Sequence, residues 1–418
     1  MFMSEFPALH PLFPLSTRLT MSRSIGTKKP PSGNAPRGSQ MAVNISDSSD
    51  APPSNESLLF GALEDVVGPR VLCTSLSRSQ FASAVADHLP DADVICFFLD
   101  VFLAQQSRDE IQLSPGIVSV ICETDFPDGP FDTIVLPFRK NGEAELTREL
   151  LQQAHERLTI GGRLITTTNN PEDEWLHDQL QVLFGKITRR PEPRGVVYLA
   201  TKTEPLRRVR EFTANFAFRD GERLIHAVSR PSIFSHRKLD VGARALLECT
   251  AASEAVVPGS RILDLGCGSG AVGLTLALRK PGVHVHAVDS NPRALQCALL
   301  GAEANGIVAV SEPPKPSRAG DAVPDGESST MSIQLDASGH VRYPRTFDLV
   351  MANPPYYSNW VIAAIFIEAA ARALKPDGRL FLVTKSPNWY RNNLHFVLPD
   401  VEFTSIRDYT VVTARQQR

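Results

Sequence analysis

The sequence has few cysteines, and none of them has metal-binding spacing. This absence of C-x-x-C pairs excludes the common zinc and redox motifs and offers no disulfide framework. We therefore expect free, buried thiols, no metal site and a reducing, cytoplasmic setting. The six cysteines lie far apart, at Cys73, Cys96, Cys122, Cys249, Cys267 and Cys297.

Long hydrophobic runs and a strong net charge are also absent. No apolar run approaches the roughly 20 residues that a membrane-spanning helix needs, so we expect no membrane partner. The net charge of the 418-residue chain is only −3, so a nucleic-acid partner must be met by a local basic patch. With 42% hydrophobic and 21% charged residues, the composition is that of a globular protein, and the length favours two domains.

Acidic residues and periodic patterns are scarce at the start of the chain. Residues 1–56 are rich in Ser, Pro, Asn and Gly and carry almost no acid before Asp47. Such a composition predicts a disordered N-terminal extension. A true start at Met21 or Met41 and an organelle transit peptide stay open as alternatives, whereas the stretch lacks the apolar core of a secretory signal.

Two stretches of the chain repeat one another. FDTIVLPF begins at Phe131 and LTIGGRLITTT at Leu158, while FDLVMANPP begins at Phe347 and LKPDGRLFLVT at Leu374. Both pairs are 216 residues apart. Each copy has the pattern of a strand, a helix, a glycine turn and a second strand.

The similarity between the halves continues upstream, where RVLCTSLSRS parallels RILDLGCGSG. Alternating strands and helices favour a doubly wound sheet, so we expect an α/β fold of two tandem, duplicated Rossmann-like domains. A Pro- and Ser-rich insertion at 306–330 is expected to be disordered. The expected bounds are a first domain at 57–205, a connection at 206–230 and a second domain at 231–418.

The second copy carries a glycine-rich loop after its first strand, ILDLGCGSG. Three glycines let the backbone turn tightly and approach a ligand, and the next helix points its N–H groups at that ligand. The spacing is G-x-G-x-G, with an acid two residues before the first glycine, and differs from the G-x-G-x-x-G of dinucleotide folds. The candidate cofactor-binding residues of this loop are Asp264, Gly266, Gly268 and Gly270.

A second acid closes the next strand, VHVHAVD. Asp289 stands 19 residues after Gly270, and a carboxylate in this place can accept hydrogen bonds from both hydroxyls of a ribose. NAD uses the same acid, so Asp289 does not identify the cofactor by itself, and a helix N-cap is its structural alternative. Asp336, in SIQLDASG, is the candidate for a third-strand acid bordering adenine.

A rigid corner, Asn353-Pro354-Pro355-Tyr356, follows the apolar run FDLVMA. The side-chain carbonyl of Asn353 and the backbone carbonyl of Pro354 can each accept one N–H of a planar amine, which localises the amine's lone pair. The proline rings fix φ and hold both acceptors in place. The ring of Tyr356 offers a face on which a flipped base can stack.

The glycine loop and the corner resemble motifs of class I methyltransferases, which bind S-adenosylmethionine. The segment FSHRKLDVG further resembles the ribosomal RNA guanine-N2 methyltransferases of the RsmC type (methyltransferase small domain). The resemblance implies Asn353, Pro354 and Tyr356 as catalytic residues and Phe234 beside the cofactor. It implies methylation of the exocyclic N2 of a guanine in ribosomal RNA, in particular of the small subunit. A cationic methyl donor requires no strong general base, so the ten histidines need no catalytic role.

The first copy has lost both motifs. No glycine occurs in Ser75–Ser79, Cys73 replaces the acid, and Pro137 stands where Asn353 stands. We expect this degenerate copy to bind no cofactor, to support the catalytic domain and to help hold RNA. The basic residues expected to contact phosphates lie in KITRRPEPR (Lys186–Arg194) and LRRVR (Leu206–Arg210).

Three other functions stay open. A protein glutamine methyltransferase and an N6-adenine methyltransferase both fit the corner, and a non-catalytic RNA-binding assembly module would have two vestigial copies. The RsmC type also carries a degenerate first copy, which favours it. The expected partner is ribosomal RNA or the small ribosomal subunit, and the expected state is a monomer.

Overall fold

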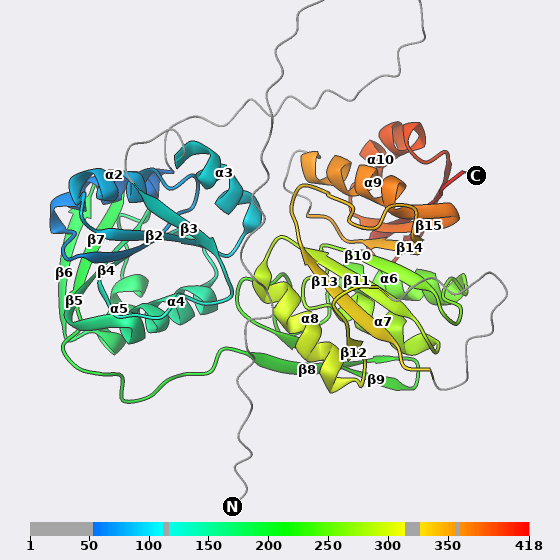
Figure 1. Cartoon of the computed structure of the whole chain (residues 1–418), viewed down its shortest axis with the longest axis horizontal. Coiled ribbons are helices and arrows are strands. Elements are labelled where there is room, and N and C mark those ends of the chain that lie inside the picture. The colour runs from blue at the N-terminus through cyan, green and yellow to red at the C-terminus, as the bar shows by residue number, and fades with distance from the viewer. Residues whose placement is uncertain (1–52, 112–116, 314–326, 356–359, 418) are drawn as a thin grey trace, which may run out of the picture. The chain divides into compact units, whose positions relative to one another are not determined.

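The computed structural model describes residues 53–111, 117–313, 327–355 and 360–417. Its first half is a seven-stranded sheet in the order β3-β2-β1-β4-β5-β7-β6. Helices α2 and α3 cover one face of this sheet, and α4 and α5 cover the other (Figure 1). The elements are α1 (Ser54–Ser57), η1 (Leu58–Asp65), β1 (Arg70–Thr74), α2 (Gln80–His88), β2 (Asp93–Phe98), α3 (Val101–Ile111), β3 (Val118–Cys122), β4 (Phe131–Phe138), α4 (Ala144–Arg157), β5 (Leu158–Thr168), α5 (Trp175–Leu183), β6 (Lys186–Glu192) and β7 (Gly195–Thr201).

The second half is an eight-stranded sheet in the order β12-β13-β11-β10-β14-β15-β17-β16. Helices α6, α7 and α8 pack on one face, and α9 and α10 pack on the other. The elements are α6 (Val241–Ala252), β10 (Arg261–Leu265), α7 (Ala271–Arg279), β11 (His284–Asp289), α8 (Pro292–Ala304), β12 (Val308–Ala309), β13 (Thr330–Leu335), β14 (Phe347–Ala352), α9 (Val361–Ala373), β15 (Leu374–Thr384), α10 (Pro387–Asn393), η2 (Leu394–Phe396), β16 (Asp400–Ile406) and β17 (Tyr409–Arg415).

The two sheets share strand order and register, which confirms the predicted duplication. In each sheet the central strands are parallel and the last pairings are antiparallel. β4 starts opposite β5 at Phe131 and Leu158, and β14 starts opposite β15 at Phe347 and Leu374. Both pairings then shift register at the same place. A shared irregularity of this kind indicates two copies of one fold.

Burial follows from this layered arrangement. Every residue of the central strand β10 is buried, because helices cover both faces of a parallel sheet. All six cysteines are free, and only Cys122 is partly exposed, as the sequence predicts. Within the described ranges, no helix combines the length and apolarity that crossing a bilayer would require.

The expected connection at 206–230 differs from the structure. A hairpin of β8 (Ala214–Asp220) and β9 (Arg223–Ser229) occupies much of it and packs on the second half through Phe218, Ile225 and Ala227. Apolar residues alternate along both strands, and Gly221 takes a left-handed φ of 59° in the turn. The neighbouring basic cluster obscured this alternation in the sequence.

Two other expected boundaries also move. The insertion predicted at 306–330 is shorter, since Val308–Ala309 forms β12 and β13 begins at Thr330. Its interior, 314–326, lies outside the described residues, as does most of the predicted extension at 1–56. The last residues of that extension belong to the first half, because α1 begins at Ser54 and Glu56 is fully buried.

Candidate cofactor and catalytic site

The candidate residues of the second copy meet at one edge of its sheet. Strands β13, β11, β10 and β14 are adjacent and parallel. The glycine loop follows β10, Asp289 ends β11, Asp336 follows β13 and Asn353 follows β14. Since the carboxyl ends of parallel strands share an edge, the fold brings these residues to the place where such sheets bind ligands.

The three glycines of the loop all have left-handed backbone angles. The φ angles of Gly266, Gly268 and Gly270 are 67°, 55° and 74°. Residues with a Cβ disfavour this region. At Gly270 a Cβ would also lie 2.8 Å from the Cβ of Ala298 in α8. The loop conformation therefore depends on glycine, and it leaves its backbone open for close approach by a ligand.

Asp289 ties the glycine loop to the end of β11. Its Oδ2 accepts a hydrogen bond from the Gly268 N–H at 2.9 Å, and its Oδ1 accepts one from the Asn291 N–H at 2.9 Å. Burial raises the pKa of Asp289 above its usual range, and the backbone N–H donors oppose that shift. Each carboxylate oxygen can accept more than one hydrogen bond, so the geometry fits the ribose of an adenosine ligand.

Asp264 lies behind the loop. Its carboxylate is 4% exposed and accepts a hydrogen bond from the Gly273 N–H at 3.0 Å, in the first turn of α7. Burial raises its pKa to about 7. These contacts let Asp264 anchor the helix that follows the loop, and its direct contact with a cofactor stays a prediction.

Phe234 and Asp336 flank the same edge. The Phe234 side chain is 68% exposed, and its neighbour Ile233 is buried near Gly268. The Asp336 carboxylate accepts hydrogen bonds from Ser338 Oγ at 2.8 Å and from the His340 N–H at 3.0 Å, within its own loop. Roles for Phe234 and Asp336 beside a cofactor stay predictions.

The corner after β14 has a fixed amide. Asn353 Nδ2 donates a hydrogen bond to Asp240 Oδ2 at 3.0 Å. The same oxygen accepts from the Ala243 N–H at 3.1 Å, where Asp240 caps helix α6. A carboxylate only accepts, so the amide nitrogen of Asn353 faces Asp240 and its carbonyl faces away. Pro354 is buried beside it, whereas Tyr356 lies outside the described residues.

Sequence reasoning missed several residues around this amide. A Cβ at Gly242 would lie 2.8 Å from Asp240 Oδ2, 3.3 Å from Asn353 Oδ1 and 3.2 Å from Tyr409 Cε1, so only glycine leaves the corner open. The Lys385 ammonium lies 4.8 Å from the centre of the Tyr409 ring. The signal for Asp240 and Gly242 was present in the L-D-x-G part of the segment before β10.

The histidines near the sheet have structural surroundings. His286 belongs to β11 and is buried, with Nδ1 2.8 Å from Oγ of Ser332 in the neighbouring strand β13. Burial lowers the pKa of His286 to about 4, so the ring is neutral near pH 7. Among the residues that the structure describes, no group of three His, Cys, Asp or Glu side chains is placed to hold a metal ion.

In the first copy, the side chain of Glu56 occupies the loop that follows β1. The fully buried carboxylate of Glu56 accepts hydrogen bonds from Ser75 Oγ at 2.7 Å, from the Leu76 N–H at 3.1 Å and from Ser77 Oγ at 3.3 Å. Burial raises the pKa of Glu56. An internal carboxylate therefore uses the donors of the loop that follows β1.

The other two site positions of the first copy carry apolar residues. Phe98 ends β2, where Asp289 ends β11, and Pro137 lies near the end of β4 in the place of Asn353. Phe98 is 2% exposed and belongs to the core. The first copy thus lacks both the ribose acceptor and the amide.

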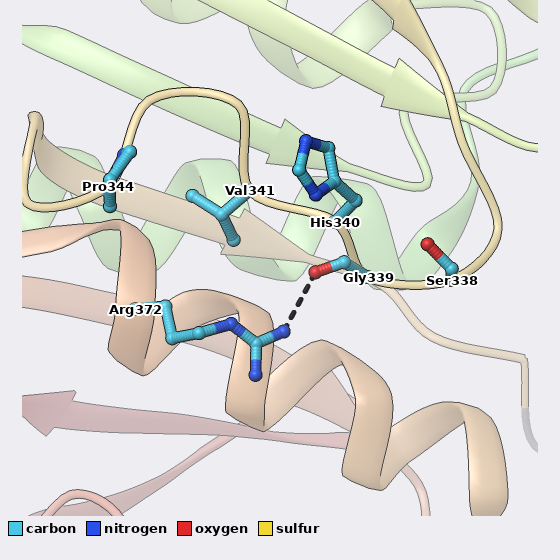
Figure 2. Close-up of a pocket in the computed structure, with 6 residues that line it drawn as sticks. All are labelled: Ser338, Gly339, His340, Val341, Pro344 and Arg372. Carbon is cyan, nitrogen blue, oxygen red and sulfur yellow. Dashed lines mark hydrogen bonds between the residues drawn. The ribbon is translucent and has the colours of Figure 1, made fainter. Parts of the chain in front are cut away.

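A surface pocket of the second copy lies beside the loop of Asp336, whose hydrogen-bond partners Ser338 and His340 line it. Figure 2 shows it between the loop after β13 and helix α9, where Arg372 Nη2 donates to the Gly339 carbonyl at 2.8 Å. None of the candidate site residues lines it. The lining residues are Ser338, Gly339, His340, Val341, Pro344 and Arg372.

The strand order, the glycine loop after the first strand and the Asn-Pro-Pro corner after the fourth are features of the class I methyltransferase fold. The sequence profile of the family "Methyltransferase small domain" matches residues 225–313 and 326–413, two segments of the second half that flank the insertion. The second half of the chain is thus similar to this family, which supports the predicted resemblance to methyltransferases of the RsmC type.

Two curated relatives illustrate the similarity. "Ribosomal RNA small subunit methyltransferase C" of Chromohalobacter salexigens is 32% identical over 169 residues, which cover 38% of this chain and 43% of that protein. The match thus spans less than half the length of that relative. "Ribosomal RNA large subunit methyltransferase G" of Pseudomonas syringae pv. tomato is 26% identical over 345 residues, which cover 80% of this chain and 83% of that protein.

A solved structure has the same fold over both halves. It is the "T. Thermophilus 16S rRNA N2 G1207 methyltransferase (RsmC) in complex with AdoMet and Guanosine", with a TM-score of 0.66 and 20% sequence identity. The match covers 86% of this chain and 92% of that chain. The tandem arrangement of two class I methyltransferase folds is therefore shared.

Proposed function

We propose that this chain transfers a methyl group from S-adenosylmethionine to the exocyclic N2 of a guanine in ribosomal RNA. The observation that carries the proposal is the oriented amide of Asn353, held by Asp240 at the sheet edge that also carries the glycine loop. When bound, S-adenosylmethionine supplies an electrophilic sulfonium methyl group. The left-handed glycines and Asp289 fit its adenosine part, since they offer an open backbone and ribose acceptors.

The chain's own residues activate and orient the amine. An exocyclic amine is a weak nucleophile because its lone pair is delocalised into the ring. The carbonyls of Asn353 and Pro354 accept its two N–H groups, which localises the lone pair toward the incoming methyl group. Asp240 fixes the Asn353 amide, and the prolines fix the backbone, so little reorganisation is needed during transfer. The excess proton leaves to solvent after transfer, without a catalytic histidine.

The relatives' names favour ribosomal RNA methylation over the three alternatives. These are methylation of a protein glutamine, methylation of an adenine at N6 and a non-catalytic RNA-binding role. A small-subunit guanine is the first candidate, because the name of the RsmC structure gives N2 of a guanine in 16S rRNA and the names of the small-subunit relatives give small-subunit ribosomal RNA. A large-subunit target is the second candidate, because the large-subunit relative aligns over 80% of this chain and thus over both halves. Cytoplasmic location and a monomeric state stay predictions.

Methylation of defined RNA substrates tests the proposal. The purified chain is incubated with labelled S-adenosylmethionine and one of four substrates: small subunits, large subunits, or the naked RNA of either. Mass mapping then identifies the product. We expect one N2-methylguanine in small-subunit RNA. Methylation of large-subunit RNA alone would select the second candidate, and transfer only to glutamine or adenine would contradict the proposal.

We propose that the first copy takes part in RNA binding through its basic residues. Arg189 and Arg190 lie on the exposed edge strand β6. Two of the expected phosphate contacts already have acidic neighbours, since Arg190 pairs with Asp65 and Arg207 Nη2 lies 3.3 Å from a Glu204 oxygen. Such exposed pairs contribute little energy and can exchange for phosphate contacts.

A further inference from the structure

The segment Arg230–Lys238, here called the clamp loop, connects β9 to α6 and contacts both parts of the candidate cofactor site. Ile233 is 4% exposed, and its Cγ2 lies 3.8 Å from the point where a Cβ at Gly268 would stand. Asn291 Nδ2 donates to Ser232 Oγ at 2.9 Å, and the Asn291 N–H donates to Asp289. A shift of the clamp loop would therefore change the surroundings of both the glycine loop and Asp289.

The backbone of the clamp loop is strained. Ser232, Ser235 and Arg237 have φ angles of 82°, 59° and 71°, although none of them is glycine. Left-handed backbone is unfavourable for residues with a Cβ. Such conformations persist where the surrounding structure holds them in place. The contacts of the clamp loop must therefore include groups that enforce this shape.

Helix α4 of the first copy supplies such groups at the exposed end of the clamp loop. The carboxylate of Glu143 accepts a hydrogen bond from the Ser232 N–H at 2.9 Å. Glu145 binds the Arg237 guanidinium through two oxygens, at 3.0 and 3.1 Å. Two of the three left-handed residues, Ser232 and Arg237, are thus held directly by glutamates of the degenerate copy.

A buried ion cluster holds the other end. Glu149 of α4 is 5% exposed and accepts hydrogen bonds from Arg230 Nη2 at 2.6 Å and from Arg293 Nη1 at 2.7 Å. Arg293 is fully buried, and the same Nη1 donates to the Pro231 carbonyl at 3.0 Å. Loss of the Glu149 charge would leave these two buried cations to share Asp125, which lies 2.5 Å from Arg230 Nη2 and 3.7 Å from Arg293 Nη2. Removing one carboxylate from such a cluster is costly.

We propose that Glu149, together with Glu143, is a positioning residue of the S-adenosylmethionine site. Helix α4 of the first copy holds the strained clamp loop against the glycine loop and thereby preorganises the site in the second copy. This inference rests on the proposed function, because it requires the second copy to bind S-adenosylmethionine. The first copy, which has no cofactor site of its own, would then shape the cofactor site of the second copy without contacting the substrate.

Calorimetry with S-adenosylmethionine on the full-length chain tests Glu149. We expect Glu149→Gln to raise the Kd and the KM for S-adenosylmethionine about tenfold, because preorganisation is lost, while kcat at saturation changes little. The matched control is Asp220→Asn, which weakens another largely buried pair, that of Asp220 with Arg279 at 2.8 and 2.9 Å. This control should lower Tm but keep the Kd within about twofold.

A second pair of variants changes exposed side chains, so we expect both variants to fold. Glu143 and Glu174 are exposed N-cap residues of α4 and α5, and neither side chain caps its own helix. We expect Glu143→Ala to raise the Kd about threefold and Glu174→Ala to leave it unchanged. If Glu149→Gln does not fold, this pair decides.

The outcomes separate the inference from the proposed function. Wild-type binding together with unchanged Kd values in folded Glu149→Gln and Glu143→Ala would overturn the positioning role alone. Equal losses of affinity in Glu149→Gln and Asp220→Asn would assign the effect to stability and overturn it as well. A wild-type chain that binds no S-adenosylmethionine would overturn both proposals.

Discussion

The two copies keep one fold and differ in what occupies the same edge of the sheet. Ser79 and Gly270 both precede the helix after the first strand, with φ angles of 66° and 74°. Only this last position of the loop keeps its left-handed backbone without glycine, since Ser75 and Ser77 lack the positive φ angles of Gly266 and Gly268. Glu56 fills the loop of the first copy, whereas Asp289 flanks the open loop of the second.

This difference shows how a loop without glycine keeps its buried polar groups satisfied. The hydroxyls of Ser75 and Ser77 and the Leu76 N–H need acceptors once they are buried. Glu56 provides them from a helix that precedes β1. The degenerate loop has therefore become part of the folded core, and the contacts of α4 give this copy a role outside its own loop.

The largest expected effect distinguishes the copies at the corner. Asn353→Ala should lower turnover about a thousandfold, because one of the two acceptors for the target amine is removed. The Kd for S-adenosylmethionine should stay within about twofold, since in the proposed mechanism Asn353 contacts the target amine and not the methyl donor. Radiolabel transfer and calorimetry measure the two quantities. Asn141→Ala, in the exposed loop after β4 of the first copy, is the control. Substantial turnover in Asn353→Ala would contradict the mechanism.

The next largest effect concerns the buried carboxylate of Glu56, which occupies the loop of the first copy. Glu56→Ala should lower the free energy of unfolding by about 3 kcal/mol, because several buried donors lose their acceptor. Urea denaturation measures this change. Glu64→Ala is the control, since the Glu64 side chain is 89% exposed. Equal stabilities of Glu56→Ala and Glu64→Ala would show that the filled loop contributes nothing to folding.

A pH-dependent difference between the copies follows from β11. Burial lowers the pKa of His286 from 6.5 to about 4. The unfolded chain then takes up a proton below pH 6.5 that the folded chain refuses, so stability is lost as the pH falls from about 6.5 toward 4. At pH 5 this histidine costs about 2 kcal/mol relative to pH 7.

Replacement by the residue of the first copy tests this cost. Ile95 occupies the place of His286, since each pairs with the matching leucine of the neighbouring strand. His286→Ile should reduce the loss of stability between pH 7 and pH 5 by about 2 kcal/mol. Urea denaturation at both pH values measures it, with the exposed His395→Gln as control. An unchanged pH slope in His286→Ile would show that burial does not depress this pKa.

Much of the fold could be predicted because its signals are local. The constant offset of 216 residues gave the duplication, and Gly and Pro marked the loop and the corner. The hairpin β8–β9 was not predicted, because the basic residues beside it indicated an irregular connection at 206–230. β12 was not predicted, because a strand of two residues has no recognisable periodicity. Its pairing also depends on β13, which lies beyond the insertion.

The missing parts of the site are contacts between residues far apart in sequence. Asp240 and Asn353 are 113 positions apart, and Glu149 and Arg293 are 144 apart. No periodicity or spacing reports such a pair, because only the packed helices bring the groups together. The glycines and Asp289 were predictable for the opposite reason, since backbone geometry at a strand end constrains the residue type locally.

The smallest expected effect comes from exchanging equivalent residues between the glycine loop of the second copy and the loop after β1 of the first copy. Gly268→Ser introduces the residue that the first copy carries at Ser77, and a left-handed φ of 55° then costs a side-chain residue about 1–2 kcal/mol. We expect the Kd for S-adenosylmethionine to rise about tenfold, as calorimetry would measure. The reciprocal change, Ser77→Gly, should create no second binding site, because Glu56 fills that loop and Phe98 stands in place of the ribose acceptor. Two binding sites in Ser77→Gly would show that this glycine alone decides whether a copy binds S-adenosylmethionine. An unchanged Kd in Gly268→Ser would place the cofactor away from this loop.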